Sequence, residues 1–117
     1  MKSRFNLDWK RISSHTVTFE KSTISYVYIL TNYHGNVMYV GATDDLKKRI
    51  YFHKKALIPG FTKKYNVKKL VYYEVLSSPY EALEREKKLK GLSRVKKNRI
   101  VEKLNPTWTE LPIPVGR

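Results

Sequence analysis

Five polar side chains in this sequence have the types that cutting a phosphodiester bond requires. Tyr28 is followed, after ten intervening residues, by Tyr39-Val40-Gly41, Arg49 and His53 lie one helical turn apart, and Glu86 stands alone farther along the chain. A guanidinium can bind two phosphate oxygens and stabilise charge that develops at phosphorus. A phenol or an imidazole can position or deprotonate an attacking water, and a carboxylate can bind a divalent metal ion. The set therefore indicates hydrolytic chemistry on a nucleic acid backbone.

Glu86 is the member of this set that the surrounding pattern explains least. Its predicted helix turns Ala82, Leu83 and Leu89 toward the core, and Glu86 lies three or four residues from each of them. An inward carboxylate needs a cation. One option is a salt bridge to a nearby Lys or Arg, which helix geometry alone favours, and the other is Mg²⁺ or Mn²⁺ with a shell completed by waters and substrate phosphate.

The other members of the set also have ordinary structural alternatives. Arg49 could be one of many cations on a basic helix, and His53 could be a partly exposed histidine at a helix edge. The two tyrosines could be strand aromatics, which is the role expected of Tyr72 and Tyr73. The order and spacing of the whole set, more than any single residue, favour a site.

The charge of the chain favours nucleic acid as the partner. The sequence has 24 Lys and Arg against 10 Asp and Glu, a formal charge of +14. The excess lies in the middle of the chain, because 18 of the basic residues and only 5 of the acidic ones fall between positions 47 and 103. Such an excess attracts polyanions by counterion release, although a Lys-rich surface can also serve solubility alone.

Cysteine is absent from the sequence, which excludes disulfides and thiolate metal sites such as zinc fingers. The first 25 residues lack a continuous apolar segment, and no run approaches the length of a membrane span. We therefore expect a soluble cytoplasmic protein, associated with the nucleoid if it is bacterial.

A β-hairpin is expected to carry the two tyrosines. Two runs rich in β-branched and aromatic residues flank a turn-forming segment at 32–36. If the turn is centred near Tyr33 or His34, Tyr28 and Tyr39 project from one face nearly opposite each other. A register shift of one residue would separate them. The two strands are expected at 26–30 and 37–40.

A helix is expected directly after the hairpin. Gly41 ends the second strand and lets the backbone turn, and Thr43 or Asp44 can cap a helix that continues to about Lys55. The apolar side of this helix is then formed by Leu46 and Ile50. Arg49 and His53 lie on the flank beside it.

The rest of the chain predicts a third strand and two more helices. The run 70–76 is β-branched and aromatic, and Ser78-Pro79-Tyr80-Glu81 is a capping box with proline at the first helical position. That helix is expected to end at Gly91, and a final helix is expected from Ser93 to the residue before Asn105. The predicted inward residues of the final helix are Val95, Ile100, Val101 and Leu104.

The order β-β-α-β-α-α over 117 residues predicts one α+β domain with a three-stranded antiparallel sheet flanked by helices. We expect the helices to pack on one face of the sheet and the domain to span 25–111. Residues 1–24 show no sustained period and are expected to form a loosely ordered extension, with room for a short edge strand at 16–19, and 112–117 are expected to form a tail.

The two tyrosine motifs resemble those of the GIY-YIG nuclease family. Tyr26-Val27-Tyr28 stands where the family has Gly-Ile-Tyr, and Tyr39-Val40-Gly41 stands where it has Tyr-Ile-Gly. Tyr26 replaces the first glycine, but the phenol of that motif is retained. The resemblance covers roughly 25–111. Three further segments look like the small single-domain branch of the family, namely Phe61-Thr62-Lys63-Lys64-Tyr65, Leu89-Lys90-Gly91 and Asn105-Pro106-Thr107-Trp108.

The resemblance implies roles for single residues. The helix arginine of the family falls on Arg49, its nearby histidine on His53, its metal-binding glutamate on Glu86 and its late asparagine on Asn105. These matches imply a DNA endonuclease with a single Mg²⁺ or Mn²⁺ on Glu86. Arg49 would stabilise charge in the transition state, while one of the two tyrosines or the histidine helps to deprotonate the attacking water.

A chain of 117 residues leaves no room for a separate recognition domain, so its basic surface is expected to supply the affinity. The expected substrate is DNA, including branched or damaged DNA, cut with weak sequence preference because phosphate contacts do not specify sequence. The residues expected to bind nucleic acid are Lys63, Lys64, Lys87, Lys88 and Asn105.

The five candidate catalytic residues are expected to line one electropositive concavity on a single face of the sheet. Two alternatives stay open, a non-catalytic nucleic-acid-binding module that retains the fold and a small basic protein associated with RNA or the ribosome. The catalytic set is Tyr28, Tyr39, Arg49, His53 and Glu86.

Overall fold

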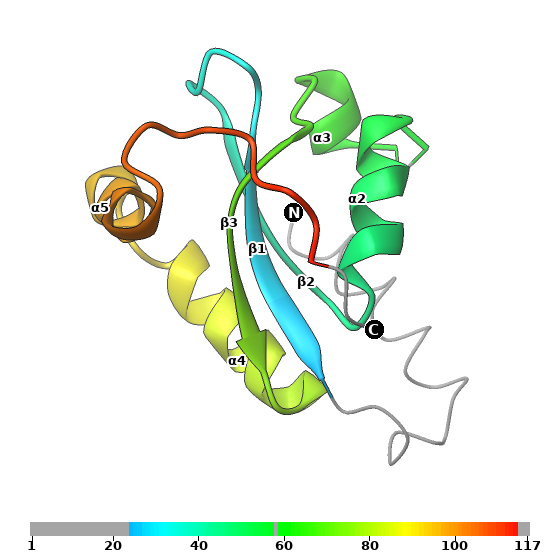
Figure 1. Cartoon of the computed structure of the whole chain (residues 1–117), viewed down its shortest axis with the longest axis vertical. Helices are drawn as coiled ribbons and strands as arrows, with labels where there is room; N and C mark the ends of the chain where they lie inside the picture. Colours follow the sequence, from blue (N-terminus) through cyan, green and yellow to red (C-terminus); the bar gives the residue numbers. More distant parts are fainter. Residues whose placement is uncertain (1–23, 58, 115–117) are drawn as a thin grey trace.

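The computed structural model describes residues 24–57 and 59–114, so the expectations for 1–23 lie outside the described part. The predicted α+β class and the order β-β-α-β-α-α are confirmed (Figure 1), with one short extra helix in the segment before the third strand. No helix in the described ranges is long and apolar enough to cross a membrane. The elements are β1 (Ser25–Thr31), β2 (Met38–Thr43), α2 (Leu46–Lys54), α3 (Phe61–Lys64), β3 (Lys69–Leu76), α4 (Pro79–Lys90) and α5 (Arg94–Leu104).

The three strands form one antiparallel sheet in the order β2-β1-β3, so β2 and β3 are its edges. Across the hairpin, Tyr28 pairs with Gly41 and Leu30 pairs with Tyr39. The hairpin is therefore centred later than predicted, and the two tyrosines are diagonal neighbours on the same face instead of directly opposite. The turn is held by Asn32, whose Oδ1 accepts hydrogen bonds from two backbone N–H groups later in the turn.

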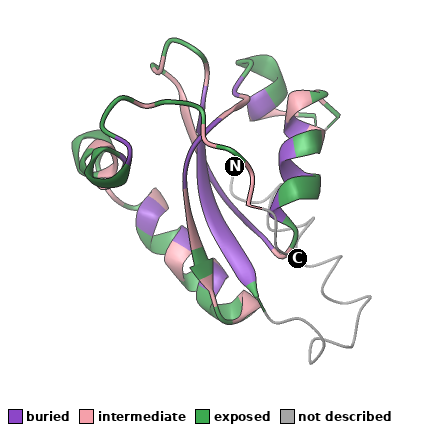
Figure 2. Cartoon of the chain, viewed as in Figure 1, coloured by how far each residue is buried: buried purple, intermediate pink, exposed green. Residues whose placement is uncertain are grey.

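Helices cover both faces of the sheet, so the expectation that they pack on one face is wrong. Successive residues of β1 point to opposite faces, and all of them are buried (Figure 2). Val27 and Ile29 pack with α4 and α5, whereas Tyr28 and Leu30 pack with α2 on the other face. After α5 the chain crosses the β3 edge, where the backbone N–H of Leu111 donates to the carbonyl of Leu70 (Figure 1).

Side-chain caps fix where the helices begin. Asp45, one residue later than predicted, caps α2 by accepting a hydrogen bond from the backbone of Lys48. Ser78 and Ser93 cap α4 and α5 as predicted. Gly91 ends α4 as predicted.

The predicted inward face of α5 is only partly correct. Val101 is buried and Ile100 packs against the core, but Val95 and Leu104 are exposed. The reason is that α5 contacts the sheet mainly along β3, which leaves a narrow inward stripe. The buried position after the helix is filled by Asn105, which donates to the backbone carbonyl of Val71.

Candidate active site

A chain of hydrogen bonds links three buried side chains on the α2 face of the sheet. The hydroxyl of Tyr28 lies 3.1 Å from Nε2 of His53, and Nδ1 of the same imidazole lies 3.0 Å from Oγ1 of Thr62. Tyr28 is 0% exposed, and the other two side chains are also buried. An uncharged imidazole between two hydroxyl groups donates from one ring nitrogen and accepts at the other. This arrangement, the Tyr28–His53–Thr62 cluster, can therefore orient a proton acceptor.

Gly41 makes room for this cluster. A Cβ atom at this position would lie 2.5 Å from the hydroxyl oxygen of Tyr28 and 3.0 Å from Cε2 of Tyr39. Both rings therefore pack so close to the backbone of Gly41 that a residue with a side chain would not fit there. The expectation that Gly41 ends the second strand is wrong, because β2 continues to Thr43. The structure gives a packing reason for this glycine instead.

Tyr39 lies at the outer side of the cluster. Its ring centre is 5.5 Å from that of His53 and 6.3 Å from that of Tyr28. On its other side the ring stacks on Phe61 at 6.3 Å and 26°, and Phe61 in turn contacts Tyr65 at 4.9 Å. Since Tyr39 is only half-buried whereas Tyr28 is enclosed, Tyr39 is the phenol that substrate or water can reach.

Arg49 and His53 lie one turn apart on α2, as the spacing predicted, but both are buried instead of lying on a partly exposed flank. Arg49 is 7% exposed and shares the inward side of the helix with Leu46 and Ile50. A guanidinium is rarely buried to this extent unless it is paired, and Arg49 does have interaction partners within the fold. The structure thus brings together Tyr28, Tyr39 and His53, with Arg49 on the adjacent turn.

Glu86 is buried, as the helical pattern predicted, and its charge is met by a lysine. The side chain is 3% exposed, and Nζ of Lys90 lies 2.8 Å from Oε2 of Glu86. Besides this lysine, Oε2 has no hydrogen-bond partner among the described residues. Burial raises the pKa of Glu86, and the hydrogen bond and the positive charge of Lys90 only partly oppose this. The salt-bridge option is therefore present in the structure.

The structure does not place Glu86 on the same face as the other four residues. Its helix packs with Val27 and Val40 on the face opposite α2, so the expectation of a concavity on one face of the sheet is wrong. However, α4 packs mainly against β2 and β1, and β2 is the edge strand that carries Tyr39. A substrate could contact both sets of residues only around the β2 edge.

The four predicted DNA-binding lysines are exposed, on α3 (Lys63 and Lys64) and on α4 (Lys87 and Lys88). Asn105 differs from them, since it is 6% exposed and its amide donates to Val71 and Thr109 carbonyls. Its carbonyl oxygen also accepts from the backbone N–H of Thr109. We therefore propose that the side chain of Asn105 holds the loop after α5 in shape and does not contact nucleic acid.

Two neighbours of the candidate residues were not identified by name from the sequence. Thr62 fixes the imidazole of His53 from the short helix α3, which lies in a segment where no helix or strand was predicted. Lys90 pairs with Glu86 across one helical turn, and the spacing of four residues was a signal that could have identified it.

One family model matches this chain, and several curated proteins are similar to it in sequence. The family described as GIY-YIG catalytic domain matches residues 24–99. UPF0213 protein SSP2268 of Staphylococcus saprophyticus is 36% identical over 76 residues, which cover 65% of this chain and 92% of that protein. UPF0213 protein CPE1444 of Clostridium perfringens is 35% identical over 78 residues, or 67% and 83% of the two chains. The solution NMR structure of UPF0213 protein BH0048 from Bacillus halodurans is 31% identical, covers 74% of this chain and 92% of that one, and has a TM-score of 0.49.

Proposed function

Because this chain belongs to the GIY-YIG catalytic domain family, we propose that it is a metal-dependent endonuclease that hydrolyses phosphodiester bonds of DNA. The observation that carries the proposal is the buried Tyr28–His53–Thr62 cluster beneath the half-exposed ring of Tyr39. A fold kept only for binding would not need to enclose a hydrogen-bonded imidazole between two hydroxyl groups, because each buried polar group costs free energy to desolvate.

Burial assigns different roles to the two tyrosines. Tyr39 can touch the attacking water and help to remove its proton, since part of its ring is accessible. Tyr28 is enclosed and acts as a positioning residue that holds His53 at Nε2, while Thr62 holds the ring at Nδ1. The imidazole can then accept a proton without turning away from the reacting groups.

Arg49 is the group on α2 that suits a phosphate in the transition state. Its planar fork can bind two phosphate oxygens, and a guanidinium that is already held in place needs no reorganisation when charge develops at phosphorus. It lies one helical turn before His53, so both groups face the same region.

The residues present fit a divalent ion held by one carboxylate. The carboxylate that would hold the ion is Glu86, which is buried on α4. The buried Oε2 of Glu86 has no partner besides Lys90 among the described residues, so a divalent cation could take the place of the lysine ammonium there. Mg²⁺ commonly takes one or two carboxylates and fills its shell with water and phosphate oxygens. When bound, the ion would stabilise negative charge on the phosphate and the leaving oxygen.

DNA suits the surface around this site. Lys63 and Lys64 are exposed on the same short helix that supplies Thr62, and Nζ of Lys64 lies 5.3 Å from the ring centre of Tyr65. Lysines contact backbone phosphates without reading sequence, and accessible rings stack on bases of any kind. We therefore expect weak sequence preference and selection by DNA structure.

A second candidate function is a non-catalytic nucleic-acid-binding module. The observation that favours it is the position of Glu86, which is paired with Lys90 and separated from Arg49 by the sheet. Such a module would keep the basic surface but would not need a metal ion for its activity.

One cleavage experiment decides between the two functions. Duplex, nicked, flapped and branched DNA are incubated with the protein in Mg²⁺, in Mn²⁺ and in chelator, with binding measured in parallel. The proposal predicts metal-dependent cutting that Glu86→Gln abolishes without loss of binding. Binding without cutting of any of these DNAs in either metal would support the non-catalytic module instead.

A further inference from the structure

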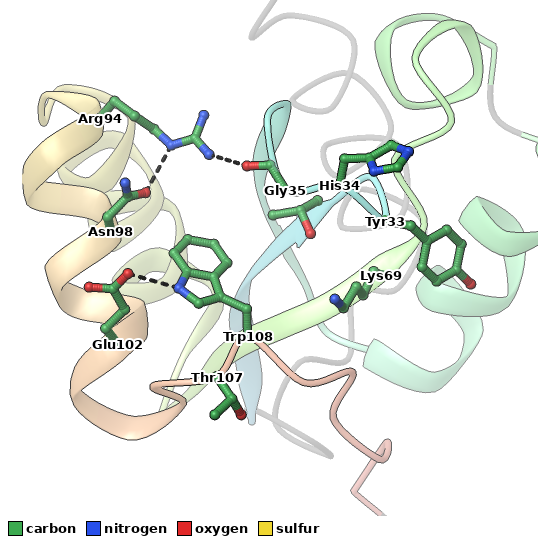
Figure 3. A pocket seen from close by; sticks show the side chains of 10 residues that line it. Tyr33, His34, Gly35, Lys69, Arg94, Asn98, Glu102, Thr107 and Trp108 are labelled. Carbon is green, nitrogen blue, oxygen red and sulfur yellow. Dashed lines mark hydrogen bonds between the residues drawn. The ribbon is translucent and has the colours of Figure 1, made fainter.

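A cavity lies at the turn end of the hairpin, on the α5 face of the sheet. It has a volume of about 420 Å³ and lies between the end of β1, the β1–β2 turn, α5 and the segment that follows α5. Figure 3 shows the indole of Trp108 between Glu102 and Asn98 of α5 on one side and Gly35 of the turn on the other. The volume falls in the range of small-molecule sites.

We call this cavity the Trp108 pocket. The indole of Trp108 is held in a fixed position within it. Trp108 has φ of 57°, an uncommon conformation for a residue of this size, and its backbone N–H donates to the carbonyl of Asn105 at 3.0 Å. Its Nε1 donates to a carboxylate oxygen of Glu102 at 2.8 Å. Glu102 keeps its negative charge at the pocket wall, on the α5 side of the ring. A flat ring fixed at both ends is a ready stacking surface.

Two cationic side chains line the pocket. Lys69 lines the pocket from the start of β3, is half-buried and forms no ion pair within the described ranges. Arg94 lines it from the start of α5, where its Nη2 donates to the carbonyl of Gly35 at 2.6 Å and its Nε donates to Asn98 at 2.8 Å. These contacts hold the guanidinium beside the pocket without neutralising its charge, so an anionic group would be attracted there.

The floor of the pocket holds a polar atom without a partner. Thr31 lines the cavity, is 1% exposed, and its Oγ1 has no hydrogen-bond partner among the described residues. A buried hydroxyl in this state costs free energy that a ligand can recover by bonding to it. The observation is independent of the ring and the cations, and it indicates a ligand with a polar edge.

We propose that the Trp108 pocket binds an unpaired nucleotide of the DNA strand that the protein engages. The base stacks on the indole, its polar edge bonds to Thr31, and the adjoining phosphate lies near Lys69 and Arg94. This inference rests on the proposed function in one respect, the choice of DNA as the nucleic acid that binds. It identifies the substrate as DNA with a single-stranded part, because a paired base cannot leave the duplex without a cost in stacking and pairing.

The position of the pocket fits a strand that also reaches the candidate active site. Thr31 follows Leu30 on β1, and Leu30 pairs with Tyr39. The two sites lie on opposite faces but near the same end of the hairpin, so a flexible single strand could pass around the turn between them, whereas a stiff duplex could not.

Fluorescence tests the proposal without any cleavage. Trp9→Phe leaves Trp108 as the single tryptophan of the 117-residue chain. This protein is titrated in chelator with a blunt duplex, with the same duplex carrying a single-stranded extension, with that extension made abasic, and with free deoxynucleoside monophosphates. We expect quenching and about tenfold tighter binding for the extension that carries bases. Equal affinity for the abasic extension would overturn the proposal, and monophosphates that bind as tightly as the extension would assign the pocket to free nucleotides instead.

Matched variants locate the effect. Trp108→Phe is expected to retain most of the preference and Trp108→Ala to lose it. Thr31→Val should raise the melting temperature, because it removes an unpartnered hydroxyl, and lower the preference for the extension by a few fold. Unchanged preference in Thr31→Val and in Lys69→Ala would overturn the proposal even if Trp108→Ala fails to fold. A protein that never cuts DNA but shows the preference would contradict the proposed nuclease function and leave the pocket assignment intact.

Discussion

Two buried tyrosines on neighbouring strands have opposite kinds of partner. Tyr28 on β1 shares a hydrogen bond with an imidazole, whereas Tyr72 on β3 donates to the carboxylate of Glu74. Arg85 binds the same carboxylate through Nε and Nη2, each at 2.9 Å. Burial and then the contact with Glu74 raise the pKa of Tyr72 to about 12. A phenol beside a carboxylate is therefore fixed in its protonated form, whereas a phenol beside an imidazole has a partner that can exchange its proton.

The two carboxylates near these strands differ in the same way. Glu74 is buried enough to raise its pKa, but hydrogen bonds from Arg85 and from Tyr72 outweigh burial and lower it. Glu86 has only Lys90, and burial raises its pKa. The region around Glu74 is therefore a satisfied structural network, and Glu86 is the carboxylate whose environment a bound cation would improve.

The largest expected effect separates the two carboxylates. Glu86→Gln should lower the rate of metal-dependent cleavage by at least ~10²-fold while DNA binding is retained, because it removes the proposed metal ligand. Glu74→Gln should lower the free energy of unfolding by about 1–2 kcal/mol and leave cleavage within a few fold, because it weakens a half-exposed ion pair. Single-turnover cleavage and thermal unfolding of both variants measure this. Near-normal cutting by Glu86→Gln would end the metal assignment.

The next effect separates a transition-state contact from a binding contact. Arg49→Ala should lower cleavage by ~10²-fold and binding by much less, since its fork is proposed to act on charge that develops during reaction. Lys63→Ala should weaken binding to all sequences alike and reduce the salt dependence by about one unit in the slope of log K against log salt. Both quantities are measured across a salt series. If Arg49→Ala loses binding and cleavage in equal proportion, Arg49 is only another phosphate anchor.

A smaller effect separates the two phenols. Tyr28→Phe should lower cleavage by about tenfold and alter its pH dependence, because the hydroxyl that positions His53 is removed. Tyr72→Phe should leave cleavage unchanged and lower the free energy of unfolding by about 1 kcal/mol through loss of its hydrogen bond to Glu74. The measurements are pH profiles of cleavage and denaturant unfolding. An identical pH profile for Tyr28→Phe and the unchanged protein would remove the positioning role.

The smallest effect is in stability as a function of pH. A carboxyl group whose pKa is raised by folding stabilises the fold when protonated, and that contribution is lost as pH rises through its folded pKa, above 4.5 for Glu86. The lowered pKa of Glu74 has the opposite sign, so its contribution is present above 4.5 and is lost as pH falls. We therefore expect Glu86→Gln to gain stability relative to the unchanged protein as pH rises, and Glu74→Gln to lose it. Unfolding curves in denaturant across this range measure the difference, and parallel curves for the two variants would contradict it.

Much of the fold could be predicted because local patterns decide it. The strand runs, the caps Ser78 and Ser93 and the inward Glu86 follow from side-chain periodicity and from short-range hydrogen bonds. The hairpin register was missed because Asn32 and the left-handed Gly35, with φ of 76°, set a turn that composition alone does not define. The continuous apolar run of β1 did indicate burial on both faces, which is the signal that the one-face expectation overlooked.

The candidate site was less predictable for a different reason. Helical periodicity shows that Glu86 points inward but not which face of the sheet its helix covers, and that choice depends on how the chain crosses after β3. Thr62 reaches His53 from an element too short to predict. The face that α4 covers and the contact from Thr62 to His53 both depend on packing between elements. A single sequence contains little information about such packing.

The most direct test concerns the central claim that Glu86 and the Tyr28–His53–Thr62 cluster act on one phosphodiester around the β2 edge. Mn²⁺ is added to the protein bound to a cleavage-resistant DNA, and the imidazole signals of His53 and His34 are followed by NMR. Our account predicts that Mn²⁺ broadens the His53 signals more than those of His34, and that Glu86→Gln removes the broadening. Mn²⁺ that binds through Glu86 but leaves His53 unaffected would contradict the account.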